Sequence, residues 1–515
     1  MPDQNRRDFL KFLGLTVSTS LMPLSAKAFS SSPTSRSIPS IKPTFEDDLV
    51  LAKGFNYSPL ISWGDKISST DSFGFNCDYT AFVPVSENSG LLWVNHEYIN
   101  PLFIHGNING EKSKKQVDEE MYNMGGSIVE IYRKKNTNEW KVKQNSSFNK
   151  RITAQTKIPF ADGKKIKGER HSIGMVANCA GGTTPWGTIL TCEENYDSFH
   201  GERKKKGKKE PGSFGWEKYY DYPPEHYGWV VEINPITGEA KKHVSLGRFG
   251  HECATTTIDR SGKLVVYSGD DKADEFLYKF ISDKKDSLDK GMLHVADLKK
   301  GEWLSLDIQK SKKLKDKFKS QKDVLINCRK AAKLLGATPL DRPEDIEVHP
   351  KNGDVYVCLS NNKKKGNYHG SILKITESDK SSTEFSSETF LAGGDHFSCP
   401  DNLTFDKNGN IWLCCDISGK SIGDFTYKSF GNNGLYYIPT EGLHAGEVFQ
   451  IGSAPKDAEL TGVTLSPDEK TLFLSVQHPG ELSKSLGELT SNWPSKKPGE
   501  IPRPTVVQVN GPLLG

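Results

Sequence analysis

The stretch that decides the fold reads Gly187-Thr188-Ile189-Leu190-Thr191-Cys192-Glu193-Glu194, in which a turn glycine leads into an apolar strand with a polar tip. Five other segments repeat this order of turn, strand and small or polar tip: residues 90–97, 262–271, 353–362, 409–416 and 470–478. Self-similarity of this kind is typical of repeat architectures. The chain is therefore predicted to contain six related strands.

A second strand runs into most of these turns and begins with polar residues: Cys77-Asp78, Arg170-His171, His251-Glu252, Arg342-Pro343-Glu344-Asp345, Pro400-Asp401-Asn402 and Thr461-Gly462. Turn sequences such as 259–262, 350–353 and 406–409 join the two strands as hairpins. Helical periodicity is confined to residues 323–335 and a turn near 118–121. Hairpins at uneven spacings favour radial blades with long loops. We predict an all-β fold, a six-bladed β-propeller with long inter-strand insertions and a few short helices; a β-sandwich or two all-β domains are the alternatives.

The polar residues of these strands converge in a propeller, because each first strand starts near the central axis and the tips of the second strands lie one strand further out. The residues expected there are mostly acidic: Asp78, Glu97, Cys192, Glu193, Glu194, Glu252, Asp270, Asp271, Glu344, Asp345, Asp401 and Asp416. So many carboxylates stay ionised together only where cations offset their charge. The pattern therefore predicts a metal site.

The residue types indicate which metals this site prefers. Carboxylate oxygens suit hard cations such as Ca²⁺, whereas a thiolate suits a softer or more highly charged metal such as iron or zinc. The tip Cys192-Glu193-Glu194 thus indicates a mixed centre. Simpler interpretations remain open: the two glutamates as surface charges, Cys192 as a buried thiol, and Arg342 as the partner of a neighbouring carboxylate instead of a phosphate clamp.

The N-terminus has the three parts of an export signal. A twin arginine, Arg6-Arg7, stands before Phe9-Leu10-Lys11, an apolar run at 12–24 and the small-residue site Ala26-Lys27-Ala28. We expect a twin-arginine signal peptide at 1–28, a linker at 29–44 and one catalytic propeller domain at 45–515. The twin-arginine export machinery is then a partner, and the protein is periplasmic or secreted. The apolar run is too short for a stable membrane anchor.

The composition argues against a nucleic-acid partner, because 68 basic and 65 acidic residues leave a formal net charge of only +3. Lysine clusters at 204–209, 310–322 and 363–365 are typical of solvated loops. Nine cysteines in an exported protein suggest disulfides, although several lie inside apolar strands, where free thiols are common.

Eight segments together resemble a known family: residues 93–101, 186–195, 227–235, 247–252, 269–271, 341–345, 400–402 and 477–481. The chain resembles the PhoX-type alkaline phosphatases, twin-arginine-exported bacterial enzymes, from Phe45 to about Val509. The resemblance implies a six-bladed propeller with a centre of iron (Fe³⁺) and calcium (Ca²⁺) that hydrolyses phosphate monoesters, and we expect a monomer.

The resemblance also implies roles for individual residues. Cys192 matches the thiolate ligand of iron. The matching carboxylate ligands are Glu97, Glu193, Glu194, Glu252, Asp270, Glu344 and Asp401. Arg342 and, as a weaker candidate, Arg503 match phosphate-binding residues. Two other functions stay open from the residues alone: a calcium-dependent lactonase-type hydrolase, which needs no thiolate, and a non-catalytic periplasmic binding propeller.

Overall fold

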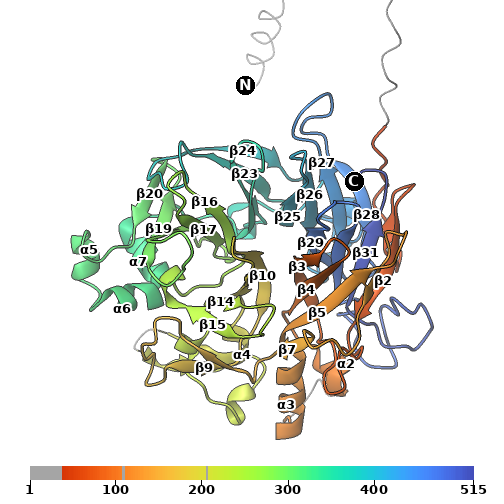
Figure 1. Ribbon diagram of the computed structural model, residues 1–515, viewed down its shortest axis with the longest axis horizontal. Coiled ribbons are helices and arrows are strands. Elements are labelled where there is room, and N and C mark those ends of the chain that lie inside the picture. The colour runs from red at the N-terminus through yellow and green to blue at the C-terminus, as the bar shows by residue number, and fades with distance from the viewer. Residues whose placement is uncertain (1–36, 107–110, 205–206) are drawn as a thin grey trace, which may run out of the picture. The chain divides into compact units, whose positions relative to one another are not determined.

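Six antiparallel sheets of four or five strands follow one another around a common centre (Figure 1). The computed structural model describes residues 37–106, 111–204 and 207–515, of which 39–515 form one compact unit. The predicted signal peptide at 1–28 lies outside the described residues. The arrangement of the six sheets confirms the predicted six-bladed β-propeller.

The first three blades are built in chain order, each from its innermost strand outward. Their strands are β3 (Cys77–Ser86), β4 (Ser89–His96), β5 (Gly125–Arg133) and β6 (Trp140–Val142) with β7 (Lys150–Ile152) beside β5; β10 (Asn178–Thr183), β11 (Ile189–Glu193), β14 (Val230–Ile233) and β15 (Ala240–His243); and β16 (Thr255–Ile258), β17 (Leu264–Gly269), β18 (Leu277–Ser282), β19 (Gly291–Asp297) and β20 (Glu302–Ser305).

The last two blades borrow their outermost strands from the N-terminal part of the chain. The strands of blades four to six are β21 (Pro343–Val348), β22 (Val355–Leu359), β23 (Ser371–Thr376) and β24 (Ser386–Ala392); β25 (Pro400–Phe405), β26 (Ile411–Cys415), β27 (Gly434–Ile438), β28 (Phe449–Ser453) and β1 (Val50–Leu51); and β29 (Glu459–Leu465), β30 (Leu472–Gln477), β31 (Thr505–Asn510) and β2 (Asn56–Ser62).

The pairing of β2 with β31 closes the ring, because it hydrogen-bonds an N-terminal strand into the same sheet as the C-terminal strand. A second link joins the sixth blade to the first. The Arg133 guanidinium at the end of β5 binds Asp468, which lies between β29 and β30, through two hydrogen bonds of 2.7 and 2.8 Å. The closed ring holds the innermost strands of all six blades around one axis.

The hydrophobic core lies between neighbouring blades. One cluster contains Leu190 from the second blade together with Val266 and Leu293 from the third. Another joins Cys358 of the fourth blade to Leu413 of the fifth. Burial of apolar area between the blades is the main stabilising term for such packing. It also fixes each blade's rotation, and hence the direction of its inner strand.

Most local predictions agree with the structure. All six predicted repeat strands are present, as β4, β11, β17, β22, β26 and β30. The helix expected at 323–335 is two helices, α6 (Gln321–Ile326) and α7 (Cys328–Leu335), interrupted at Asn327. The other α-helices in the described part of the chain are α2 (Pro101–His105), α3 (Lys114–Asn123), α4 (Asp197–His200) and α5 (Lys312–Lys315).

One strand prediction is wrong. The hairpin partner of 187–194 does not begin at Arg170-His171, since β9 (His171–Ile173) pairs with β8 (Lys157–Pro159) in a separate ribbon. Its true partner is β10, which begins at Asn178. A further ribbon pairs β12 (Glu202–Arg203) with β13 (Lys209–Glu210). No helix within the described residues has the length and apolar character that a membrane span requires.

Candidate metal centre

The inner strand or strand entrance of every blade supplies one metal-ligand type of side chain: Asp78, Cys179, Glu252, Glu344, Asp401 and Glu459. Tips of the second strands add Glu97, Glu194 and Asp416. These nine residues form four overlapping groups, and within each group the candidate ligand atoms lie within 4.8 Å of one another: Asp78, Glu97 and Cys179; Cys179, Glu194 and Glu252; Glu252, Glu344 and Asp401; Asp401, Asp416 and Glu459.

A repeated backbone feature positions the inner ligands. In five blades a non-glycine residue with positive φ stands two positions before the ligand: Asn76, Ala177, Arg342, Cys399 and Asp457, with φ between 50° and 62°. Such left-handed residues are uncommon and persist where the surrounding structure over-determines them. The kink turns the chain into the inner strand in the same way in these five blades.

β-bulges then direct the ligand side chains toward the axis. In four blades the hairpin register shifts over the ligand and its successor, starting at Asp78, Cys179, Glu344 and Asp401. A bulge leaves residues unpaired and re-aims their side chains. One local geometry therefore recurs at four of the six inner candidate ligands.

Hydrogen bonds between blades fix several of these groups. The Gln477 amide donates to Glu97 Oε2 at 2.8 Å, and the Cys179 thiol donates to Glu252 Oε1 at 3.4 Å. The hydroxyl of Thr461 donates to Asp78 Oδ1 at 2.5 Å. The cluster is thus held together across neighbouring blades before any ligand is bound.

The electrostatics of the cluster require positive charge. Burial raises the pKa of Glu252 well above its usual range, and the nearby carboxylates of Glu344 and Asp401 raise it further. Burial likewise raises the pKa of Glu97 to about 7. Burial also raises the pKa of Glu344 well above its usual range, although the guanidinium of Arg342 lowers this pKa in part. Without further cations these acids cannot all be ionised at neutral pH.

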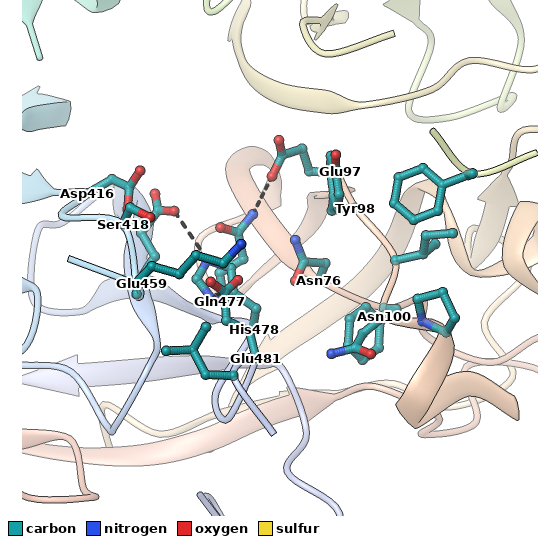
Figure 2. A pocket seen from close by; sticks show the side chains of 17 residues that line it. Asn76, Glu97, Tyr98, Asn100, Asp416, Ser418, Glu459, Gln477, His478 and Glu481 are labelled. Atoms are coloured by element: carbon teal, nitrogen blue, oxygen red, sulfur yellow. Dashed lines mark hydrogen bonds and ion pairs between the residues drawn. The ribbon is translucent and has the colours of Figure 1, made fainter. Parts of the chain in front are cut away.

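Two pockets open beside the cluster. The larger pocket, of about 500 Å³, is lined by the cluster acids Glu97, Asp416 and Glu459 together with Tyr98, Phe214 and Lys420 among others. In Figure 2, Asp416 and Glu459 lie on one side of this pocket and Tyr98 and Asn100 on the other. The smaller pocket, of about 250 Å³, is lined almost entirely by polar residues, among them Glu194, Asp271, Arg329 and Arg342.

Five of the predicted ligands lie in the cluster: Glu97, Glu194, Glu252, Glu344 and Asp401. Cys192 does not. It packs in the hydrophobic core with Leu190, Val230 and Phe249, because it lies on the second strand of its blade, opposite Val230 of the third. The thiol among the acids belongs to Cys179.

Two predicted carboxylate ligands are engaged elsewhere. Glu193 is fully buried and forms an ion pair of 2.8 Å with the equally buried Lys242, and its carboxylate also accepts from the backbone N–H groups of Val176 and Trp229. Asp270 accepts two hydrogen bonds, of 2.8 and 2.5 Å, from the Arg329 guanidinium. Both carboxylates therefore have cationic partners within the chain.

The two predicted arginines differ in position. Arg342 lies 3.0 Å from Glu344 and binds Asp271 through two hydrogen bonds of 2.8 and 2.7 Å. It lines the smaller pocket beside the cluster. Arg503 instead donates to the Trp63 carbonyl and pairs with Asp65. The described linings of the two pockets include Arg342 and leave out Arg503.

Sequence reasoning missed Cys179 and Glu459. Both lie at the start of the first strand of their blade, which is the position from which Asp78 and Asp401 were predicted to lie near the axis. They were missed because the starts of these two strands, β10 and β29, were predicted at the wrong residues. The first strand of the second blade was predicted to begin at Arg170-His171, and that of the sixth blade at Thr461-Gly462, two residues after Glu459 on the same strand.

The geometry has a counterpart among known proteins. The sequence profile of the family described as alkaline phosphatase PhoX matches residues 37–480. The chain belongs to this family. It is therefore an alkaline phosphatase, a hydrolase of phosphate monoesters.

A solved structure agrees with this assignment. PhoX from Pseudomonas fluorescens, in complex with the transition state analogue vanadate, is 30% identical and superposes with a TM-score of 0.83 over 92% of this chain and 97% of that chain. A putative 6-phosphogluconolactonase from Bacteroides uniformis is 10% identical with a TM-score of 0.33, over 77% of this chain and 79% of that chain. No curated protein sequence matches the chain.

The donor set of the alkaline phosphatase fits metal ions. Eight carboxylates and one thiol meet in the four groups, and no tight internal salt bridge neutralises Asp78, Glu252 or Asp401 among the described residues. Buried carboxylates without such partners are characteristic of sites that coordinate cations. The nine free cysteines leave the Cys179 thiol available as a ligand.

Proposed function

We propose that this alkaline phosphatase hydrolyses phosphate monoesters outside the cytoplasm with a mixed centre of iron and calcium at the propeller axis. The observation that carries the proposal is the meeting of nine ligand-type side chains, from the inner part of all six blades, in four overlapping groups. Surface acids would not be drawn from six separate hairpins to one buried place.

The ligand atoms of each group indicate which metal that group would hold. The two groups that share Cys179 combine a thiol with carboxylates, and this mixture suits Fe³⁺. The two groups built on Asp401 contain only carboxylates, which suit Ca²⁺. We therefore assign iron to Asp78, Glu97, Cys179, Glu194 and Glu252. Calcium would be held by Glu252, Glu344, Asp401, Asp416 and Glu459.

When bound, the metal ions would offset the negative charge that develops on the phosphoryl oxygens. The protein's own contribution is position. Two nitrogens of the Arg342 guanidinium bind Asp271, which leaves Nη1 turned to a single weak contact of 3.4 Å with Ser360. This Nη1 group would donate to a phosphoryl oxygen and hold it in line. The φ of 56° at Arg342 sets the direction of the side chain.

The twin arginine at Arg6-Arg7 supports export of the folded protein to the periplasm. Export after folding suits an enzyme that must assemble a metal centre from six distant hairpins. Replacement of both arginines by lysine should keep the protein in the cytoplasm, which fractionation of the native host would detect.

Metal analysis and a pair of arginine variants test the proposal. The purified enzyme should contain both iron and calcium. Arg342→Ala should lower kcat/KM for a simple monoester by about 100-fold, the scale of a lost charge-assisted contact to the reacting group. Arg503→Ala, the matched control, should change it less than twofold, because its partners are Trp63 and Asp65. Calcium without iron, or equal effects of the two variants, would contradict the proposal.

A further inference from the structure

The larger pocket reaches the metal centre on one side and solvent on the other. Glu97, Asp416 and Glu459 belong both to its lining and to the ligand groups. A phosphate ester whose phosphoryl group lies at the cluster would therefore extend its organic part into this pocket. The volume of about 500 Å³ is large enough for a ring with substituents.

Two aromatic residues of the lining, Tyr98 and Phe214, form a rigid surface. Phe214 stacks on Phe199 with ring centroids 4.7 Å apart and planes 4° from parallel. The ring of Tyr98 meets Phe214 edge-on at 5.4 Å, and the Lys112 ammonium lies 5.2 Å from the Phe214 ring centre. Phe214 is only half-buried, so one part of this fixed ring faces the pocket. A preorganised aromatic surface binds a flat ring with little ordering of side chains.

The pocket also carries a cation without a protein partner. Lys420 is exposed and lines the pocket; within the part of the chain that the structure describes, it has no hydrogen bond or ion pair. The other basic group of the lining, His478, lies 3.3 Å from Glu481 and 3.6 Å from Glu459. Lys420 alone is therefore free to pair with an anionic group of a ligand.

We propose that the larger pocket binds the organic part of the substrate and selects phosphate monoesters whose organic part combines a flat ring with a second anionic group. The ring lies against Phe214 and Tyr98, and the second anion pairs with Lys420. This inference rests on the proposed function, because it requires the phosphoryl group at the acid cluster.

Three substrates separate the two features: glycerol phosphate has no ring, phenyl phosphate has a ring, and 4-carboxyphenyl phosphate has a ring and a second anion. Differences in intrinsic reactivity cancel when each variant is compared with the wild type on the same substrate. Lys420→Met should lower the ratio of kcat/KM for 4-carboxyphenyl phosphate over phenyl phosphate by about fivefold, and Lys420→Glu by more. The effect should shrink at high salt, since the pair is exposed.

Phe214→Leu should lower kcat/KM for both aryl esters relative to glycerol phosphate by about fivefold. Lys428→Met is the matched control for Lys420→Met. Lys428 lies further along the same loop, with its ammonium 5.1 Å from the Phe425 ring, and its replacement should leave both ratios unchanged. Calorimetric binding of 4-hydroxybenzoate, the organic product, gives a readout independent of turnover and should weaken in Lys420→Met.

Unchanged ratios in Lys420→Met and Phe214→Leu, with both proteins folded and loaded with metal, would overturn the inference while the proposed function stands. Equal losses on all three substrates would overturn it too, because these residues would then act on the phosphoryl group. Wild-type protein that lacks iron or calcium would instead count against the proposed function. The metal content of every variant separates the two failures.

Discussion

The same small change at two cysteines gives the sharpest test of the metal centre. Cys179→Ala removes a thiol that lies among Asp78, Glu97, Glu194 and Glu252. Cys192→Ala removes a thiol from the hydrophobic core, one strand further out in the same blade. Sequence reasoning favoured Cys192 as the iron ligand, whereas the structure places Cys179 at the centre.

We expect Cys179→Ala to lose activity and iron, and Cys192→Ala to lose only stability. Loss of an outer-shell partner of a metal ligand already lowers activity or metal affinity 10- to 100-fold, so loss of the ligand itself should lower phosphatase activity by at least about 100-fold. Cys179→Ala should also lower bound iron. Cys192→Ala should keep its iron and destabilise the fold by about 1 kcal/mol, the scale of a small buried truncation. In a chain of this size that is a fall in Tm of about 2 °C.

Elemental analysis, phosphomonoesterase kinetics and thermal unfolding of the two variants, prepared side by side, measure these outcomes. Calcium content serves as the internal control, because two all-carboxylate groups do not include Cys179. Loss of iron in Cys192→Ala together with normal iron in Cys179→Ala would refute the reasoning, since the assignment depends on which strand and which face each thiol occupies.

Two further predictions concern ion pairs outside the centre. Lys242→Met should destabilise the protein by about 3 to 5 kcal/mol, because it leaves the buried Glu193 charge unpaired; the double variant with Glu193→Gln should recover much of the loss, and an altered metal content would contradict the structural role of Glu193. The two hydrogen bonds from Arg133 lower the pKa of Asp468 to about 2. A carboxyl with a lowered pKa stabilises the fold above its unfolded pKa and loses that contribution as pH falls, here between about 4 and 2. Solvent screening limits the effect to about 1 kcal/mol. Chemical unfolding at a series of pH values should show this dependence reduced in Asp468→Asn, and an unchanged profile would count against it.

Much of the fold could be predicted because its signals are local. Each repeat strand is marked by its own turn and by its own run of apolar residues, and all six are present. Asp78, Glu252, Glu344 and Asp401 were also predicted to face the axis, since each follows a recognisable strand start. The pairing of β1 and β2 with the last two blades was not predicted, because their partners lie about 400 and about 450 residues away along the chain.

The candidate ligand Cys179 shows where local signals end. The inner strand β10 reads Asn-Cys-Ala-Gly-Gly-Thr and has no apolar run to mark it. The left-handed residue before it is Ala177, and in other blades it is Arg342 or Cys399. Asparagine and aspartate favour that conformation, whereas these three residue types do not. The kink is therefore imposed by the packing of the blade.

The sequence alone determined the repeat, the hairpins and the acidic character of the strand ends, because periodicity and turn chemistry act between neighbouring residues. Only the tertiary structure decided that Cys179 and Glu459 face the axis and that Cys192 and Glu193 do not. Which face of a strand meets the axis depends on bulges, on left-handed kinks and on contacts between blades, and these join residues that are far apart in the chain.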